Sequence, residues 1–337
     1  MNLRNEFPIG KIINNRYCIL RTLGKGGFGD IYQVEDRNTH KKYALKTEYL
    51  NAEKQALKNE IEMLNNLKNP FIPKIYFSDE NSECRFCVMN VFGPSLADCK
   101  KLSRHCYLPS HYVLLIASET LYILESLHKQ GIVHRDIKPS NFLLRPHNKI
   151  PLCLIDFGLS GYYLTNSKKI IENANGKFIG TKKYASIFTH QKNQQTPRDD
   201  LHSWLYMIAD LSLKKLPWSR EKDSDEVLSI KKQTTASELC KNLPSRCIDL
   251  FRVVNDLEYG EIPDYKRLYS IIEEAKQQNS SEYCGDEWKC LWELDMEKSE
   301  LVNREPGDEK YDKFDPLNPH KNYPTVSFER KNKCNIM

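Results

Sequence analysis

The 337-residue sequence lacks several features that would place it in a special class. Its formal net charge is only +5 and the basic residues are scattered, so no footprint for nucleic acid is present. The most apolar run, 112–124, is interrupted by Glu119 and is too short to span a bilayer. No targeting peptide and no internal repeat is visible. Because 40% of the residues are apolar, the chain can bury a large core, and we expect a folded cytoplasmic protein.

The cysteines form no recognisable framework. Eleven are spread irregularly from Cys18 to Cys334, and a chain of this length needs no disulfides, so we expect reduced thiols. Cys84 and Cys87 make a lone CxxC pair, but no second pair follows at the spacing of a zinc site. Two strand cysteines are the favoured interpretation, with a metal site as the alternative.

The apolar pattern changes its period along the chain. Four stretches with alternating residues predict β-strands separated by polar turns: 17–23, 31–36, 41–50 and 85–92. One helix interrupts them, because apolar residues recur at spacings of three and four from Leu57 to Leu67. Beyond Pro94, three amphipathic stretches predict helices: 109–130, 199–216 and 264–278.

This change of period predicts an α+β protein of two lobes. We expect a small β-rich lobe over about 17–90 and a larger, mostly helical lobe over about 91–280. Residues 1–16 precede the first lobe as an extension. From 281 to 337 the periodicity fades and polar residues dominate, which predicts an extension or tail.

Three glycines in "LGKGGFGDIYQV" have the spacing GxGxxG. Gly24, Gly26 and Gly29 alone are a weak signal, because dinucleotide-binding folds use the same spacing. A dinucleotide site needs a helix after the last glycine, whereas alternating residues continue here as a strand. We therefore place the glycines at the tip of a hairpin, where their missing Cβ atoms let backbone N–H groups approach a triphosphate. An ordinary glycine-rich turn is the alternative.

A lysine follows in the next predicted strand. Lys46 in "YALK" lies where its ammonium would reach the α- and β-phosphates, although an exposed strand lysine is the alternative. A lysine that points inward beside a nucleotide needs a carboxylate to hold it in position. We assign that role to Glu60 rather than to Glu62, because Glu60 lies four residues before Leu64 on the predicted helix.

The most specific segments are "VHRDIKPSNFLL" and "LIDFGL". In the first, Asp136 would accept the proton of an attacking hydroxyl, Lys138 would neutralise the γ-phosphate, and Asn141 would offer an amide oxygen to a metal. In the second, Asp156 would be a carboxylate ligand of the metal. Phosphoryl transfer needs mainly positioning and charge neutralisation, and these residues supply both.

In this order, the motifs resemble those of eukaryotic protein kinases, from about Tyr17 to Lys276. The lysine two positions after Asp136 is similar to the Ser/Thr-specific pattern. The resemblance implies a two-lobed kinase fold, ATP and Mg²⁺ as cofactors, and protein substrates as partners. It also implies that the adenine ring is bound by Leu23, Ile31, Ala44, Met89, Val91 and Leu143.

Other stretches resemble one branch of that family. Instead of an Ala-Pro-Glu motif the chain has "GTKKYASIFTH", then "RDDLHSWLYMI" and "LPWS", which resemble the casein kinase I superfamily. Ser140 and the stretch "PDYKRLYSII" resemble its tau-tubulin kinase-like branch. The resemblance implies that Asp200 braces the catalytic loop, while Asp199 receives no role.

Substrate preference is predicted from the same resemblance. Casein kinase I enzymes favour acidic or phosphorylated sites by means of basic residues beside the substrate groove. Lys183 matches one of these positions, but Gly176 stands at the second, with Lys177 displaced by one. We expect an acidic context around the target Ser or Thr; a solvated basic loop is the alternative.

The sequence ends in "CNIM", which fits the C-a-a-X pattern. Met337 favours a farnesyl group on Cys334, and basic residues just before it would add attraction to an anionic leaflet. We therefore expect weak membrane association through the C-terminus, with an unmodified end as the alternative. For the whole chain, the rival function is a pseudokinase scaffold, which the presence of all five polar site residues disfavours.

Overall fold

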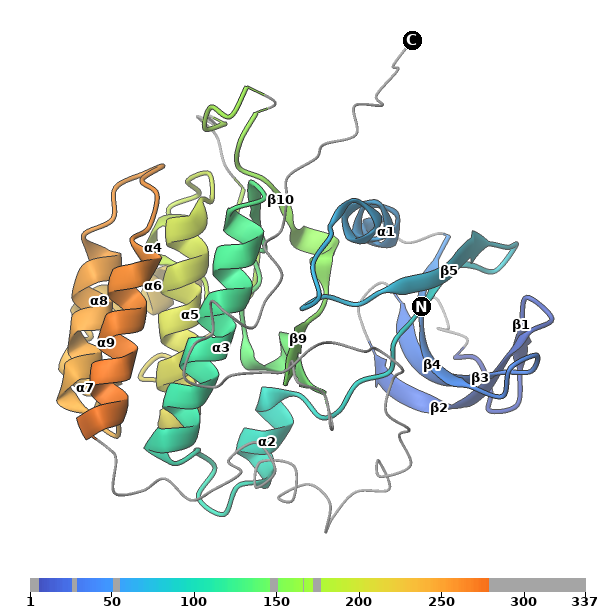
Figure 1. Cartoon of the computed structure of the whole chain (residues 1–337), viewed down its shortest axis with the longest axis horizontal. Helices are drawn as coiled ribbons and strands as arrows, with labels where there is room; N and C mark the ends of the chain where they lie inside the picture. Colours follow the sequence, from blue (N-terminus) through green and yellow to red (C-terminus); the bar gives the residue numbers. More distant parts are fainter. Residues whose placement is uncertain are drawn as a thin grey trace.

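A computed structural model describes residues 6–25, 29–50, 55–145, 151–165, 167–171 and 177–278. Figure 1 shows two lobes, a curved sheet with helix α1 on one side and a bundle of helices on the other. The predicted α+β fold of two lobes is therefore confirmed. Among the described residues, no helix combines the length and the apolar character that a bilayer span requires.

The small lobe is built on a six-stranded antiparallel sheet. The order in the sheet is β1-β2-β3-β4-β6-β5. The strands are β1 (Ile12–Ile13), β2 (Tyr17–Lys25), β3 (Asp30–Asp36), β4 (Lys42–Tyr49), β5 (Ile75–Glu80) and β6 (Cys84–Met89). All four predicted strands are confirmed, and β1 and β5 are additional. Cys84 and Cys87 both lie in β6 as buried free thiols.

Each face of this sheet buries a different apolar cluster. On one face, large side chains such as Tyr32, Leu45 and Phe86 pack together as the core of the lobe. The opposite face carries a smaller cluster in which Ala44 and Met89 meet Leu57 of α1 (Ala56–Asn66). Alternate residues of a strand point to opposite faces, so β4 contributes Leu45 to one cluster and Ala44 to the other.

The large lobe is organised around two buried helices, α3 (Ser110–His128) and α5 (Pro197–Ser212). The Trp204 indole N–H of α5 donates to the Thr120 hydroxyl of α3 at 2.9 Å, so the two helices are joined by a buried hydrogen bond. The other helices are α2 (Leu96–Leu102), α4 (Ile187–His190), α6 (Ser224–Gln233), α7 (Ala236–Leu239), α8 (Ile248–Asn255) and α9 (Tyr265–Gln278).

The beginning of α5 explains a residue that had no predicted role. Thr196 and Asp199 form a capping box, in which the Asp199 carboxylate accepts from the Thr196 backbone N–H at 2.9 Å. Asp199 also accepts from the Ser186 hydroxyl before α4. The predicted helix 199–216 therefore begins two residues earlier than expected, and it ends earlier, at Ser212.

Short elements connect α3 to α4. They are β7 (Ile132–Val133), η1 (Pro139–Asn141), β8 (Phe142–Leu144), β9 (Leu152–Leu154), η2 (Phe157–Leu159) and β10 (Gly161–Tyr162). A further short helix, η3 (Ser245–Cys247), lies between α7 and α8. The two strand pairs, β7 with β10 and β8 with β9, are antiparallel. Phe142, Leu154 and Phe157 anchor this region in the core of the large lobe.

Candidate active site

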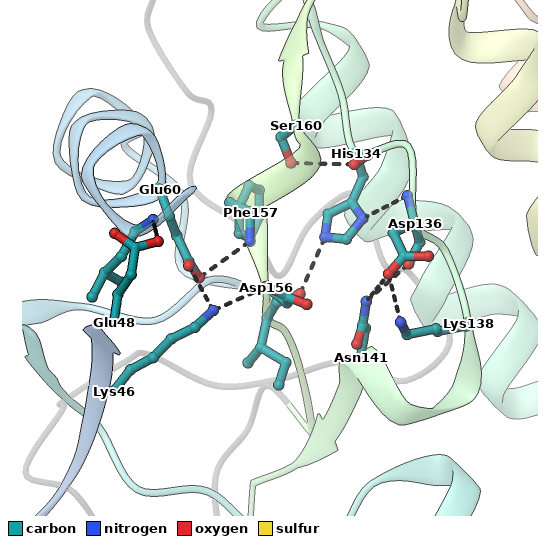
Figure 2. A network of polar contacts seen from close by, with 12 residues as sticks. Lys46, Glu48, Glu60, His134, Asp136, Lys138, Asn141, Asp156, Phe157 and Ser160 are labelled. Carbon is teal, nitrogen blue, oxygen red and sulfur yellow. Dashed lines mark hydrogen bonds and ion pairs between the residues drawn. The ribbon is translucent and has the colours of Figure 1, made fainter. Parts of the chain in front are cut away.

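Polar side chains from both lobes converge between them. Figure 2 shows two groups, one around Lys46 and one around Asp136, with His134 between them. Lys46 Nζ in β4 donates to Glu60 Oε2 of α1 at 2.6 Å and to Asp156 Oδ1 at 2.9 Å. Glu60, and not the exposed Glu62, is therefore the partner of Lys46, as its spacing predicted.

The charges of Lys46 and Asp156 stabilise each other, whereas burial raises the pKa of Glu60. Burial alone would lower the pKa of Lys46, but the carboxylates of Glu60 and Asp156 outweigh it and raise the pKa above its usual range. Burial would likewise raise the pKa of Asp156, but the nearby Lys46 ammonium holds it below its usual range. At neutral pH the lysine is charged and Asp156 is an anion.

A carboxylate of β4 fixes the start of α1. Gln55, the N-cap residue, makes no capping hydrogen bond through its side chain. Instead, the buried Glu48 Oε1 accepts from the Leu57 N–H at 2.9 Å, while its Oε2 accepts from Arg85 at 3.1 Å. Since Glu48 lies two residues after Lys46, one face of β4 holds α1 both at its first turn and at Glu60.

Asp136 is the centre of the other group. Its Oδ2 accepts from Lys138 Nζ at 2.5 Å, and its Oδ1 accepts from the Thr181 hydroxyl at 2.7 Å. The Asn141 side-chain N–H donates to the Asp136 backbone carbonyl at 2.9 Å. The structure therefore brings together the three predicted residues of this segment and adds Thr181, which the sequence analysis did not single out.

Asp200 at the start of α5 supports the loop that carries Asp136. Its carboxylate accepts from the backbone N–H groups of His134 and Arg135 at 2.7 and 2.9 Å, and it contacts His128 Nε2 at 3.0 Å. Burial would raise the pKa of Asp200, but the hydrogen bonds and charges of these histidines outweigh it and lower the pKa. The expected bracing contact is thus formed through two backbone N–H groups.

Two non-glycine residues of the site adopt left-handed backbone conformations. Arg135 has φ +68° and Asp156 has φ +69°. Such conformations are costly for residues with a Cβ atom and concentrate at functional sites. Arg135 precedes Asp136, and Asp156 is itself the predicted metal ligand, so both strained positions fall at the residues assigned to catalysis and metal binding.

The predicted adenine-binding residues lie mainly on one apolar cluster. Ala44 and Met89 are buried there, and Leu23 and Val91 pack against them. Ala44 is also paired with Met89 across β4 and β6. The remaining two come from other strands: Ile31 of β3, which pairs with Lys46, and the half-buried Leu143 of β8 in the large lobe.

The glycine-rich turn is described only in part. Gly24 is the last residue but one of β2, while Gly26 lies outside the described residues. At Gly29, a Cβ atom would stand 1.8 Å from the backbone oxygen of Thr47 in β4. A side chain is therefore excluded at Gly29 by the closeness of the neighbouring strand, which gives this glycine a structural reason besides any contact with phosphate.

The donor set near Asp156 suits a hard divalent cation. Its carboxylate is partly exposed, and because the amide nitrogen of Asn141 is bonded to Asp136, the amide oxygen is the atom left for a metal. Over the described ranges, no three His, Cys, Asp or Glu side chains cluster as a metal cage. A cation held by one carboxylate, one amide oxygen and substrate phosphates would fit this site, and Mg²⁺ is often bound in this way.

The predicted substrate-binding lysines are not equivalent. Lys183 Nζ forms an ion pair with Asp210 Oδ1 at 2.8 Å, and Lys100 Nζ reaches the same oxygen at 3.0 Å. Lys177 is exposed before α4, whereas Gly176 lies outside the described residues. Cys334 also lies outside them, so its lipidation stays a prediction.

Comparisons with known proteins agree with this geometry. The chain matches the protein kinase domain family over residues 17–279. It is 32% identical over 277 residues to a probable casein kinase I homolog of Encephalitozoon cuniculi, covering 78% of this chain and 86% of that protein. A putative casein kinase I of Caenorhabditis elegans is 32% identical over 275 residues, covering 78% and 80%.

A probable serine/threonine-protein kinase of Dictyostelium discoideum is 28% identical over 274 residues. That match covers 80% of this chain but only 55% of the longer relative. The fold and the converging site define a protein kinase domain. The chain belongs to the protein kinase family, as a member related to the casein kinase I enzymes.

Proposed function

We propose that this protein is a Ser/Thr protein kinase that transfers the γ-phosphate of ATP to protein hydroxyls with Mg²⁺. The observation that carries the proposal is the simultaneous presence of two contacts: Lys46 with Glu60, and Asp136 with Lys138. Kinase catalysis requires a held lysine for the phosphates and a carboxylate for the acceptor hydroxyl.

Each residue then has a distinct task. Lys46, kept charged by Glu60, binds the α- and β-phosphates, and Asn141 and Asp156 hold the metal, which neutralises phosphate charge when bound. Asp136 orients the acceptor hydroxyl and takes its proton, while Lys138 stabilises the charge that develops on the transferred phosphoryl group. The adenine ring is enclosed by six apolar side chains: Leu23, Ile31, Ala44, Met89, Val91 and Leu143.

The decisive experiment is a radiolabelled ATP assay on casein with purified full-length protein. We expect Asp136→Asn and Asp156→Ala each to reduce phosphate transfer by at least about 100-fold, since each removes a charge that acts in the transition state. If wild type and Asp136→Asn label casein and a broad set of other acceptors equally, the protein is a pseudokinase scaffold.

We also propose a preference for acidic residues around the target Ser or Thr. Lys100 and Lys183 share one carboxylate, Asp210, so two ammonium groups face one carboxylate, and Lys183 lies two residues after Thr181 in the chain. A peptide array should therefore show stronger labelling of acidic flanks in wild type than in Lys183→Ala. Indifference of the wild type to acidic flanks would contradict this preference.

Two finer assignments rest on the sequence. Ser140 and the segment 263–272 support a place in the tau-tubulin kinase-like branch. Farnesylation of Cys334 would give a cytoplasmic enzyme weak membrane affinity, because a single lipid anchors only marginally. Metabolic labelling tests the lipid: we expect incorporation into wild type and none into Cys334→Ser.

A further inference from the structure

Lys231, in the last turn of α6, is an unusual buried lysine. Only 5% of its surface is exposed, and its Nζ donates to the backbone carbonyls of Lys182 at 2.8 Å and Ala185 at 2.6 Å. Buried lysines are rare and are usually paired with carboxylates. In the described chain, the hydrogen-bond partners of Lys231 are two carbonyls and an imidazole, and none is a carboxylate.

The remaining neighbours complete a cage around the amino group. His190 Nε2 lies 3.3 Å from Nζ, and its other ring nitrogen contacts the Ser224 hydroxyl at 3.1 Å. Burial and the nearby Lys231 lower the pKa of His190 to about 4, so this ring is neutral at pH 7. Its Nε2 also lies 3.3 Å from the Lys182 carbonyl oxygen, one of the two carbonyls that Lys231 binds. The Tyr206 and Trp218 rings lie 4.9 and 5.3 Å from Nζ and face it as cation–π partners.

Lys231 binds a turn that begins at Thr181, the residue whose hydroxyl donates to Asp136. The Thr181 carbonyl accepts from the N–H groups of Tyr184 and Ala185, which closes a turn, and the Thr181 hydroxyl donates to Asp136. Between the two carbonyls bound by Lys231, the Lys183 carbonyl accepts from the Trp218 indole N–H at 2.8 Å. Three carbonyls of this turn are thus fixed by buried donors of the large lobe.

We propose that Lys231 is a positioning residue for the protein acceptor, which acts by fixing the turn 181–185 and takes no part in nucleotide binding. This inference rests on the proposed function, because an acceptor whose hydroxyl reaches Asp136 must pass beside Thr181. Lys46, Glu60 and Asp156 make no hydrogen bond to this turn among the described residues. Lys138 donates to the Thr181 hydroxyl at 3.2 Å, and that hydroxyl donates to Asp136, so these two residues meet the turn at a side chain and not at the carbonyls that Lys231 binds. We therefore expect acceptor binding to depend on Lys231 more than nucleotide binding does.

The test compares Lys231→Met with Lys232→Met, a matched change at the exposed neighbour on the same helix. Steady-state kinetics are measured with an acidic serine peptide, and ATP hydrolysis is measured without any acceptor. For Lys231→Met we expect kcat/KM for the peptide to fall about tenfold or more, mainly through KM, because two buried hydrogen bonds are lost. The KM for ATP and the rate of ATP hydrolysis should change less than about twofold.

Trp218→Phe provides a second variant, since it removes the donor to Lys183 but keeps an aromatic ring. In this variant too, kcat/KM for the peptide should fall, while the KM for ATP and the rate of ATP hydrolysis should change little. A parallel loss of peptide phosphorylation and ATP hydrolysis in both variants, or no loss of peptide phosphorylation in Lys231→Met, would overturn the inference.

Peptide binding separates this inference from the proposed function. Fluorescence anisotropy with a labelled acidic serine peptide, in the presence of ADP and Mg²⁺, needs no phosphate transfer. Weaker binding to Lys231→Met than to Lys232→Met supports the positioning role, and equal binding contradicts it. A wild type that binds the peptide but never phosphorylates it would instead contradict the proposed catalytic activity.

Discussion

Lys46 is held by two carboxylates from different parts of the chain, Glu60 of α1 and Asp156 before η2. The position of its ammonium therefore depends on both lobes. Asp156 is also the proposed metal ligand, so only Glu60 is free to hold Lys46 throughout the reaction. This division of tasks makes Glu60 the more informative residue to change.

Replacing Glu60 by Gln should show how much the charge of this side chain, and not its shape, contributes to phosphate transfer. The amide keeps an oxygen near Lys46 but loses the charge, and charge-assisted hydrogen bonds contribute about 1.5–3 kcal/mol. We expect kcat/KM for phosphate transfer to fall about 10- to 100-fold. Glu62→Gln is the matched control because its side chain is exposed on the same helix, and its activity should stay within about twofold. Equal effects of the two changes would contradict the assignment.

The protonation of Lys231 predicts a dependence of stability on pH. Burial lowers the pKa of Lys231 to about 7, whereas in the unfolded chain a lysine keeps its proton to about pH 10. Between these values the unfolded state binds more protons, so the free energy of unfolding should rise with pH. His190 is already neutral in this range, and burial raises the pKa of Tyr206, so neither changes charge.

Urea unfolding at pH 7.5 and pH 9 measures this difference. The gain in stability on going to pH 9 should be larger in wild type and in Lys232→Met than in Lys231→Met. The same gain in all three proteins would show that Lys231 does not change protonation differently on folding.

At the scale of one element, helix α1 depends on a capping residue from strand β4, Glu48. Glu48→Ala removes the acceptor of the Leu57 N–H, and we expect a loss of about 1–2 kcal/mol in unfolding free energy together with lower kcat. Glu80→Ala serves as the control, because Glu80 shares Arg85 but is an exposed partner whose pair contributes little. Urea denaturation and steady-state kinetics give the two quantities. Unchanged kcat in a destabilised Glu48→Ala would limit Glu48 to stability.

The elements that the sequence predicted are those with a strong period. The apolar residues from Leu57 to Leu67 predicted α1, and the same face correctly selected Glu60. β5 was missed because most of its side chains are exposed, so it has no clear alternation. The polar α6 was missed for a similar reason, since only Val227 and Lys231 are buried in it.

The contacts that escaped prediction join residues far apart in the chain. Thr181 meets Asp136 across 45 positions, and Glu48 caps α1 at Leu57, nine positions further along the chain. Neither pair produces a periodic or spacing signal in one sequence. Lys183 was singled out from a resemblance, but its pairing with Asp210 depends on how α5 packs, which no local pattern encodes.

At the scale of the whole molecule, the site is complete only when both lobes contribute. ATP with Mg²⁺ should therefore stabilise the folded chain, by about 2.7 kcal/mol at a ligand concentration of 100 times Kd. Thermal unfolding should shift upward with both present and much less after a chelator is added. Asp156→Ala should lose the metal-dependent part of the shift. A shift that is the same with and without metal would contradict the proposed metal site.

The double attachment of α1 to β4 has a consequence for inhibitor chemistry. Compounds that force this helix outward would have to break the Glu48 contact as well as the Glu60–Lys46 pair. Compounds that occupy the adenine cluster and leave the helix in place should therefore be the more productive starting points in a screen.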